Sequence, residues 1–347
     1  MDMQDRVAMT KDDVADWWVE GRLFKGLIIV VAVYLAITLV FGLIWSNEPD
    51  LFDVQQSAEQ RSAERHRGLV TGSVISSTLI QVAETLMDKP GGYLSNDVTM
   101  PGIYLDNMPN WEFGVLVQVR DLSRSMRESF SRSQSQSTED PDLSLAEPRF
   151  HFDSESWIFP RTEDEYRDAI NYADAYLLRL SDSSQSSAQF YSRADNLRVW
   201  LATIETRLGS LSQRLSASVG QRRVNTDLAG DADAEQSTST PSDIEVKTPW
   251  YEIDDVFYEA RGTTWALVHF LKAVEIDFAD VLQKKNALVS VRQIIRELEA
   301  TQEPMWSPII LNGGGFGVFA NHSLVMASYV SRANAAIIDL RELLSRG

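Results

Sequence analysis

The stretch from Gly26 to Trp45 most constrains what this chain can fold into, because its twenty residues carry no charge. A helix needs about 20 apolar residues to cross the hydrocarbon core of a bilayer. A helix of a soluble bundle would show a polar face, which this stretch lacks. It is too long for the apolar region of a cleaved signal peptide, and SNEP at 46–49 offers no small-x-small cleavage pattern. We therefore predict a retained transmembrane anchor over residues 24–46.

The charges on either side of this segment predict its orientation. Arg22 and Lys25 directly precede it, whereas the first basic residue after it is Arg61. Positively charged residues stay on the cytoplasmic side of a membrane, so residues 1–23 are predicted to be a cytoplasmic tail. Tryptophan and basic side chains favour the edges of a bilayer. The predicted membrane-interface residues are Trp17, Trp18, Arg22, Lys25 and Trp45.

Composition restricts the partners of the domain that follows. The chain has a net charge of −18, and its first 25 residues hold six acids and four bases, which leaves −16 for the rest. Such a domain should repel phosphate backbones, so we predict no nucleic-acid partner. Cysteine is absent, which excludes disulfides and thiolate metal sites. No two of the four histidines have metal-pair spacing, so we predict no metal and no cofactor: His66, His151, His269 and His322.

Apolar periodicity predicts helices in most of this domain. Two seams alternate steps of four and three residues, as in heptad-patterned helices. The first comprises Tyr166, Ile170, Ala173, Leu177 and Leu180, then Leu197, Leu201, Ile204, Leu208, Leu211 and Leu215. The second comprises Ile253, Phe257, Ala260, Thr264, Leu267, Leu271, Val274, Phe278 and Val281. We predict a mainly α protein in which one transmembrane helix precedes an elongated antiparallel helical bundle with long heptad-patterned helices.

The bundle is predicted in two parts, residues 47–219 and 248–347. Residues 220–247 between them are rich in Gln, Asp, Ser and Thr and hold few large apolar residues, which predicts a disordered linker. A glycine-rich run at 312–317 matches neither the dinucleotide nor the P-loop pattern, so it is interpreted as a tight connection, with a hairpin near Asn312.

The loop at 90–110 holds the best candidates for a binding site. It is dense in Gly, Pro, Asn and Asp but also carries several apolar residues, so we expect it to pack onto the domain. Its mixture of aromatic, amide and carboxylate groups suits a sugar or a peptide. The alternative is a packed loop whose polar side chains only cap helices and turns. The predicted binding residues are Tyr93, Asp97, Tyr104, Asp106, Asn107, Asn110 and Trp111.

Glu84 raises the question of catalysis, since with Asp97 or Asp106 it could form the carboxylate pair of a glycosidase. A solvated glutamate on a helix face is far commoner, so no catalytic residue is predicted. An enzyme would need at least two of these groups, or of Glu112, to converge in one pocket. The acidic cluster at 252–259 lacks the EF-hand spacing and is interpreted as favouring a helix start.

Four runs carry a resemblance to a known family: VAETL at 82–86, DKPGGYLSND at 88–97, LDNMPNWEF at 105–113 and FSRSQSQS at 130–137. They resemble a family of Gram-negative bacterial membrane proteins catalogued as a domain of unknown function (number 2333). The resemblance covers most of the region after the apolar segment, and is weaker beyond residue 220. It implies a bacterial inner-membrane protein with a periplasmic domain, and it implies no activity.

Three functional hypotheses follow. The first is a membrane-anchored, non-enzymatic scaffold or adaptor that contacts an envelope protein or the cell wall, with the lipid bilayer as its other partner. The second is an envelope enzyme or binding protein that uses residues 84–112 to bind or cleave a glycan. The third is a ligand sensor in which a shift of the bundle crosses the membrane. The heptad seams would also allow a homo-oligomer, but packing within one chain is favoured, because several seams in the same chain can satisfy one another.

Overall fold

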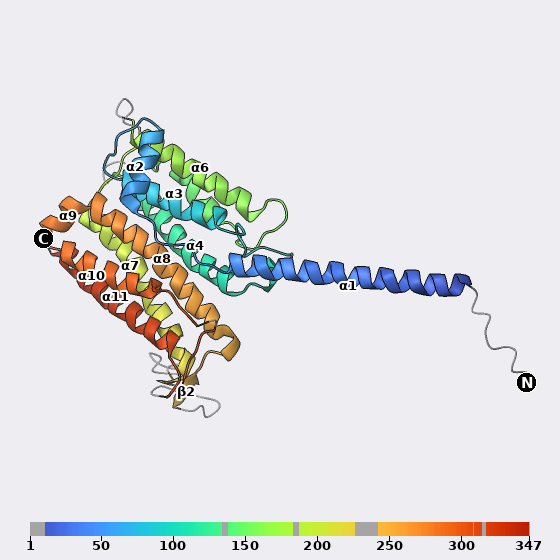
Figure 1. Ribbon diagram of the computed structural model, residues 1–347. Helices are drawn as coiled ribbons and strands as arrows, with labels where there is room; N and C mark the ends of the chain where they lie inside the picture. The colour runs from blue at the N-terminus through green and yellow to red at the C-terminus, as the bar shows by residue number, and fades with distance from the viewer. Residues whose placement is uncertain are drawn as a thin grey trace, which may run out of the picture.

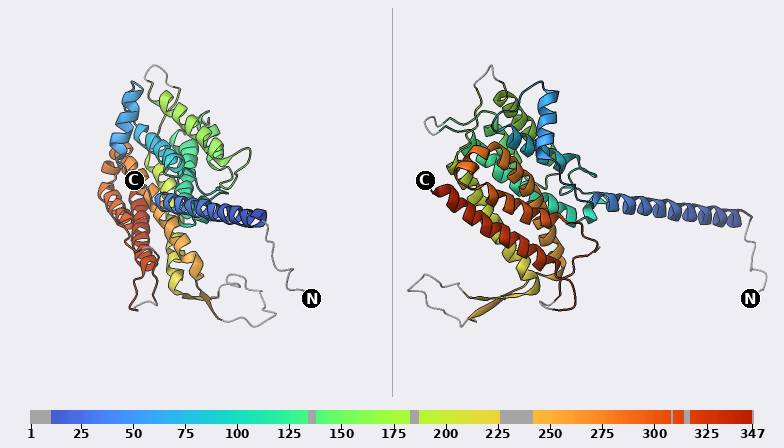
Figure 2. Two further views of the ribbon diagram at one scale, coloured as in Figure 1. Left: turned by 45° about the vertical axis from the view of Figure 1, so that its right-hand side comes forward. Right: turned by 60° about the vertical axis from the view of Figure 1, so that its left-hand side comes forward.

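A long helix, α1 (Lys11–Trp45), projects from one side of a helical bundle (Figures 1 and 2). The computed structural model describes residues 11–133, 138–182, 187–225, 242–307, 309–313 and 317–346, without the side chains of residues 11–23. The segment from Phe24 to Trp45 is long and apolar enough to cross a membrane, and none of its most apolar stretch is buried in the protein. The predictions of an N-terminal apolar helix and a mainly helical chain are confirmed.

The bundle consists of helices that lie in three groups along the chain. The first group comprises α2 (Val54–Glu64), α3 (Ser73–Asp88), α4 (Asn107–Ser125), α5 (Leu143–Phe150) and α6 (Thr162–Leu180). A single long helix, α7 (Ala194–Ser216), follows. The last group comprises α8 (Ile253–Asp277), α9 (Ala279–Lys284), α10 (Leu288–Glu299) and α11 (His322–Ser345). Short turns of other helix types lie at Gly102–Tyr104, Met126–Phe130, Ala217–Val219, Trp250–Glu252 and Ala300–Gln302.

The central pair of the bundle is α4 and α8. On one side α3 packs against this pair and α6 packs against α3, and on the other side α10 and α7 contact it, with α11 against both (Figure 1). The heptad seams predicted from the sequence supply much of the buried core, including Leu201 and Leu208 of α7 and Leu267 and Leu271 of α8. Because helices before and after residues 220–247 share one core, the two predicted parts form a single bundle.

The direction of neighbouring helices only partly follows the predicted antiparallel arrangement. Helices α7 and α11 are antiparallel. Glu205 of α7 pairs with Arg341 of α11, and four residues later in α7, Gly209 lies near Asn334, which comes earlier in α11. Helices α4 and α8 run parallel. Trp111, near the start of α4, lies beside Gly262 of α8, and Phe130, which follows the end of α4, packs against Phe278, which follows the end of α8. Because the two helices are parallel, the chain between them must return to the end of the bundle at which α4 begins. A short loop joins antiparallel neighbours and could not span this distance.

Two glycines bring the backbones of α4 and α8 into contact. A Cβ atom on Gly262 would overlap the carbonyl group of Trp111, and one on Gly114 would overlap the carbonyl oxygen of Glu259. Small residues are needed wherever helix backbones approach this closely, because any side chain would force them apart. The crossing therefore depends on the absence of a side chain at these two positions.

The predicted linker has ordered ends. Strands β1 (Gln221–Val224) and β2 (Asp243–Val246) pair antiparallel, with residue 221 opposite 246 and 224 opposite 243. Residues 226–241, the centre of the predicted linker, lie outside the described residues. Near the end of the chain, a single bridge joins Asn312 to Asn321 and closes the connection that precedes α11.

A buried carboxylate connects the end of α8 to the start of α3. Asp277 is 8% exposed, and its oxygens accept the backbone N–H groups of Gly72 at 2.9 Å and Ile75 at 2.7 Å. Burial raises the pKa of Asp277 to about 6, although these backbone hydrogen bonds act in the opposite direction. The cost of removing the charge from water thus exceeds what the hydrogen bonds return.

The glycine crossing gives a first prediction. Gly262→Ala should lower the free energy of unfolding by about 1–3 kcal/mol, because the new methyl group must push α4 and α8 apart. Gly209→Ala is the matched control: it lies in α7 with its nearest neighbour, an Asn334 side-chain nitrogen, at 3.5 Å from the added atom. It should stabilise the helix by about 0.5–1 kcal/mol. Urea unfolding of the full chain in detergent, followed by circular dichroism, measures both; equal effects would contradict the close crossing.

The second prediction concerns pH. Between about pH 4 and pH 6 the folded state keeps a proton on Asp277 that the unfolded state has released, so stability should fall as the pH rises through this window. The difference corresponds to about 3 kcal/mol at most. The side chain of Asp277→Asn cannot titrate. The free energy of unfolding of the wild type, measured relative to this variant, should therefore fall by up to that amount from pH 4 to pH 7. Parallel unfolding profiles at pH 4, 5, 6 and 7 would refute the assignment.

Candidate functional site

A buried ion pair fixes the loop that contains the predicted binding residues. The ammonium nitrogen of Lys89 lies 2.5 Å from a carboxylate oxygen of Glu112, and the two side chains are 1% and 0% exposed. Lys89 also donates to the carbonyl oxygen of Gly92. Glu112 accepts the backbone N–H groups of Leu94 and Ser95, both at 2.9 Å, and the Ser95 hydroxyl at 2.5 Å. The Glu112 carboxylate therefore joins the first residues of the loop to α4, the helix that follows the loop.

Burial and the neighbouring groups act in opposite directions on the pKa of Glu112. Burial raises the pKa of Glu112, while Lys89 and the hydrogen bonds from Ser95 and Leu94 lower it. A carboxylate in a dry interior is stable only with a counter-charge and with its lone pairs satisfied. Glu112 has both, so its observed role is to hold the loop backbone.

The start of this loop packs against the end of α1. Gly91 has a φ of +91°, a conformation that side chains strongly disfavour. A Cβ atom on Gly91 would lie 2.7 Å from the indole ring of Trp45. Trp45, predicted to lie at the membrane interface, is thus partly buried against the loop. Of the other predicted interface residues, Lys25 is exposed, and the side chains of Trp17, Trp18 and Arg22 lie outside the described residues.

Two of the predicted binding residues lie in the core. The Tyr93 side chain is 4% exposed, its hydroxyl donates to the carbonyl oxygen of Ser154 at 3.1 Å, and its ring meets that of Tyr166 edge-on at 5.7 Å. Trp111 is fully buried, with its ring centre 5.2 Å from that of Trp265. Both residues are enclosed by the domain in this structure.

Three others lie at the start of α4. Asp106 accepts the N–H of Asn107 at 2.9 Å, as a helix cap does. The Asn110 amide donates to the Asp106 carbonyl at 3.0 Å and to the carboxylate of Asp255 at 2.8 Å. Partial burial, followed by nearby carboxylates, raises the pKa of Asp255 to about 6. The group therefore joins the start of α4 to the start of α8.

The remaining two lie in the middle of the loop. Asp97 is partly buried against Gly102, and Tyr104 is 72% exposed. The seven predicted residues are thus divided among the core, the start of α4 and the middle of the loop, where Tyr104 forms part of the surface beside α1. Whether this surface binds a ligand stays a prediction.

The carboxylates considered for catalysis are each engaged separately. Glu84 pairs with Arg61 of α2, Glu112 is enclosed with Lys89, and Asp106 caps α4. Desolvation and the nearby carboxylate of Glu163 raise the pKa of Asp97. Glu84, Glu112 and Asp106 are thus engaged by three different partners, while Lys89, the partner of Glu112, also lies near Asp97.

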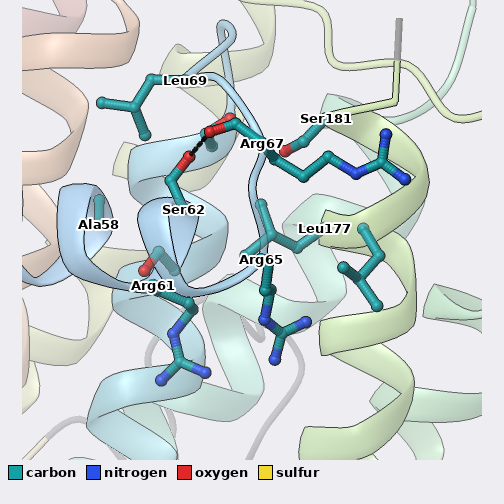
Figure 3. Close-up of a pocket in the computed structure, with 11 residues that line it drawn as sticks. Ala58, Arg61, Ser62, Arg65, Arg67, Leu69, Leu177 and Ser181 are labelled. Atoms are coloured by element: carbon teal, nitrogen blue, oxygen red, sulfur yellow. Dashed lines mark hydrogen bonds between the residues drawn. The ribbon is translucent and has the colours of Figure 1, made fainter. Parts of the chain in front are cut away.

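A cluster of arginines, which sequence reasoning did not select, surrounds a small hollow between α2 and α6 (Figure 3). Arg61 in α2 and Arg65, which directly follows α2, extend in the same direction, whereas Arg67 extends away from them past Ser181 (Figure 3). The hollow has a volume of about 10 Å³, room for about one water molecule. Arg65 pairs with Asp174 and Arg67 with Asp182, so the cluster is neutralised by acids and clamps α2 onto its neighbours. The sequence signal that could have indicated this cluster is the presence of three arginines within residues 61–67 of an otherwise acidic chain.

A second feature that the sequence did not reveal is a polar joint between α1 and the bundle. Two guanidinium nitrogens of Arg261, in α8, donate to the carboxylate of Glu48 at 2.5–2.8 Å. A third donates to the carbonyl oxygens of Thr301 at 2.9 Å and Glu303 at 3.1 Å. Bidentate pairs of this kind fix orientation as well as distance. A hollow of about 590 Å³ lies beside this joint.

A buried histidine reinforces the joint. The backbone N–H of Phe52 donates to His269 Nε2 at 3.0 Å, and the two rings stack 3.9 Å apart. Burial lowers the pKa of His269 to about 3, so the ring is neutral and its Nε2 is free to accept this hydrogen bond. Among the described residues no group of acids and histidines is arranged to hold a metal ion.

A third feature is an apolar groove of about 460 Å³ between α1 and the loop. Its walls are Leu35, Thr38, Leu39, Gly42, Leu43 and Ser46 on α1, and Met100, Pro101, Tyr104 and Leu105 on the loop. Thr38, Gly42 and Trp45 form a partly buried stripe along this side of α1, whereas the other residues from Phe24 to Ile44 are exposed.

Within the part of the chain that the structure describes, the fold and these contacts define a protein in which one candidate membrane helix is fixed to a large helical domain. The chain belongs to the DUF2333 family, described as an uncharacterized protein conserved in bacteria, whose family model matches residues 17–347. The family suggested by the sequence resemblance is thereby confirmed. No match was found among curated proteins or among solved structures.

The buried pair gives a third prediction. Lys89→Met should lower the free energy of unfolding by about 3–5 kcal/mol, because it leaves the Glu112 carboxylate buried without its counter-charge. The control is Arg167→Met, which breaks an exposed pair with Asp88 at 2.9 Å and should change stability by less than about 1 kcal/mol. Urea unfolding in detergent measures both variants. A small effect of Lys89→Met would mean that the loop does not depend on this pair.

Proposed function

We propose that α1 anchors the protein in the bacterial inner membrane, that the bundle lies in the periplasm, and that it serves as a non-enzymatic scaffold or adaptor for envelope proteins. The basic residues before the apolar segment and the acidic ones directly after it support this orientation. The family description, a protein conserved in bacteria, agrees with a bacterial membrane.

The observation that carries the proposal is the rigid joint between α1 and the bundle. Helix α8 holds Glu48 through Arg261 and Phe52 through His269, and the loop packs against Trp45 at Gly91. A flexible linker would let the bundle wander relative to the membrane. A fixed joint instead presents its surfaces at one height and orientation, which is what an adaptor requires.

The distribution of carboxylates counts against the alternative of a glycan-cleaving enzyme. Two-carboxylate hydrolysis needs both groups to face one sugar, roughly 5–10 Å apart. Glu112 is enclosed with Lys89, Glu84 pairs with Arg61, and Asp106 caps α4. These contacts favour a structural use of the carboxylates over a catalytic one.

The fourth prediction tests topology and partner together, and it uses the absence of cysteine from the chain. A single Val289→Cys replacement introduces a thiol at a residue of α10 that is 77% exposed. In cells whose outer membrane has been permeabilised, this thiol should react with a maleimide that cannot cross the inner membrane and that carries a photocrosslinker. A Thr10→Cys variant, on the predicted cytoplasmic side, should react only after lysis. Illumination and mass spectrometry should then identify a reproducible envelope protein joined to the Val289 position.

The opposite labelling pattern would refute the periplasmic placement. Labelling at Val289 that gives glycan fragments and no protein partner would contradict the adaptor function and favour the glycan-binding alternative. A second exposed position, Val199→Cys on α7, reports on a different face of the bundle.

A further inference from the structure

The connection between α3 and α4 lies alongside the apolar helix, not only at its end. The groove between them runs from Leu35 to Ser46 on α1. A Cβ atom on Gly42 would lie 3.6 Å from the Cβ of Pro101 and 4.0 Å from a methyl group of Leu105. Since a helix rises 1.5 Å per residue, Leu35 lies about 15 Å from Trp45 along the axis. The loop therefore covers one side of roughly the outer half of the segment.

This position matters because the apolar segment has no spare length. Its 22 residues, from Phe24 to Trp45, span about 33 Å, close to the roughly 30 Å of a hydrocarbon core. If the bilayer ended below the loop, at Leu35, only about 17 Å of helix would remain to cross it. A membrane that contains the whole segment must therefore also surround the loop.

The loop has the composition that such a position requires. Residues 98–105, VTMPGIYL, carry no charge in a chain with 24% charged residues. Four of its large apolar side chains face outward: Val98 is 51%, Met100 39%, Ile103 57% and Tyr104 72% exposed. Exposed apolar groups gathered in one place mark an interaction surface.

A second uncharged loop lies next to the first. Residues 156–160, SWIFP, precede α6, and Trp157, Ile158 and Phe159 are 56%, 61% and 85% exposed. The amide of Asn96 donates to the carbonyl oxygen of Ser156 at 3.0 Å, which holds the two loops together. The connection into α6 extends on the side from which α1 leaves the bundle (Figure 1).

A third element completes the same side of the domain. Trp306 is 94% exposed, and its neighbours Met305 and Ser307 line the same hollow as Ser46 and Asn47 at the end of α1. Tryptophan and tyrosine side chains concentrate at membrane interfaces, where an apolar ring and a polar tip are both satisfied.

We propose that residues 98–105 and 157–159, together with Trp306, form an apolar rim that inserts into the outer leaflet of the bilayer around α1. The occupant of the rim and of the groove beside it is lipid: acyl chains against Met100, Ile103 and Phe159, and the glycerol region against Tyr104 and Trp157. The inference rests on the proposed anchoring by α1. The domain is then seated in the membrane at several points, which fixes its depth and tilt beyond what a single helix can do.

The fifth prediction tests this with single-cysteine variants of the full chain. Tyr104→Cys and Phe159→Cys replace exposed side chains, so folding should be unaffected. Each is labelled with an environment-sensitive NBD fluorophore and reconstituted in vesicles of phosphatidylethanolamine and phosphatidylglycerol. Lipids with a nitroxide high on the acyl chain, next to the glycerol region, should quench both labels by about twofold or more, because the rim spans the glycerol region and the adjoining part of the acyl chains. A label at Val289→Cys, an exposed residue of α10, should be unaffected, because α10 lies across the bundle from α1 (Figure 1).

A label at Leu39→Cys, at a residue of α1 that lines the groove and is 66% exposed, separates the possible failures. If this label is quenched while those at residues 104 and 159 behave like Val289, the helix spans the bilayer and the rim is wrong. If the Leu39 label is not quenched either, both the anchor and the rim are wrong. A blue-shifted but unquenched label at residue 104 would mean that protein, such as a second copy of the chain, covers the loop instead of lipid, and would also overturn the proposal.

Discussion

The buried carboxylate of Glu112 is the interaction on which the membrane-facing part of this structure depends. It sits near the start of α4, yet its contacts reach Lys89 after α3 and the backbone of Leu94 and Ser95. Enclosing an ion is costly, and the cost is offset only when a counter-charge and several donors are fixed around it. The glycine turn that receives Trp45 is therefore held from inside, and so is the loop that follows α1 along its length.

A second set of contacts on the other side of α1 makes the joint rigid. Arg261 binds Glu48 and the carbonyl groups after α10, and His269 binds the backbone of Phe52. One attachment would leave α1 free to pivot, whereas attachments to the loop and to α8 define a single direction. This geometry connects the two proposals: an adaptor benefits from a fixed height above the membrane, and an apolar rim in the lipid fixes that height.

The sequence predicted the features that depend on local pattern. The uncharged segment, the helical periodicity of α7 and α8 and the packed character of the loop were all recognisable, because hydrophobic spacing and glycine or proline content act over a few residues. The parallel crossing at Gly114 and Gly262, the pairing of Arg261 with Glu48 and the arginine cluster were not. Each joins residues far apart in the chain, and nothing near Gly262 indicates that its neighbour is the carbonyl of Trp111.

By itself, the sequence determined that this chain has an N-terminal helix able to cross a membrane, that the described part after it is mainly helical, and that it belongs to its family. Only the tertiary structure decided how the predicted binding residues are used: Tyr93 and Trp111 are enclosed, Asp106 and Asn110 organise a helix start, and Tyr104 is exposed beside α1. The physical reason is that burial and polar partnership are properties of the folded chain. A residue's type sets what it can bind, but the neighbours that folding brings to it decide what it does bind.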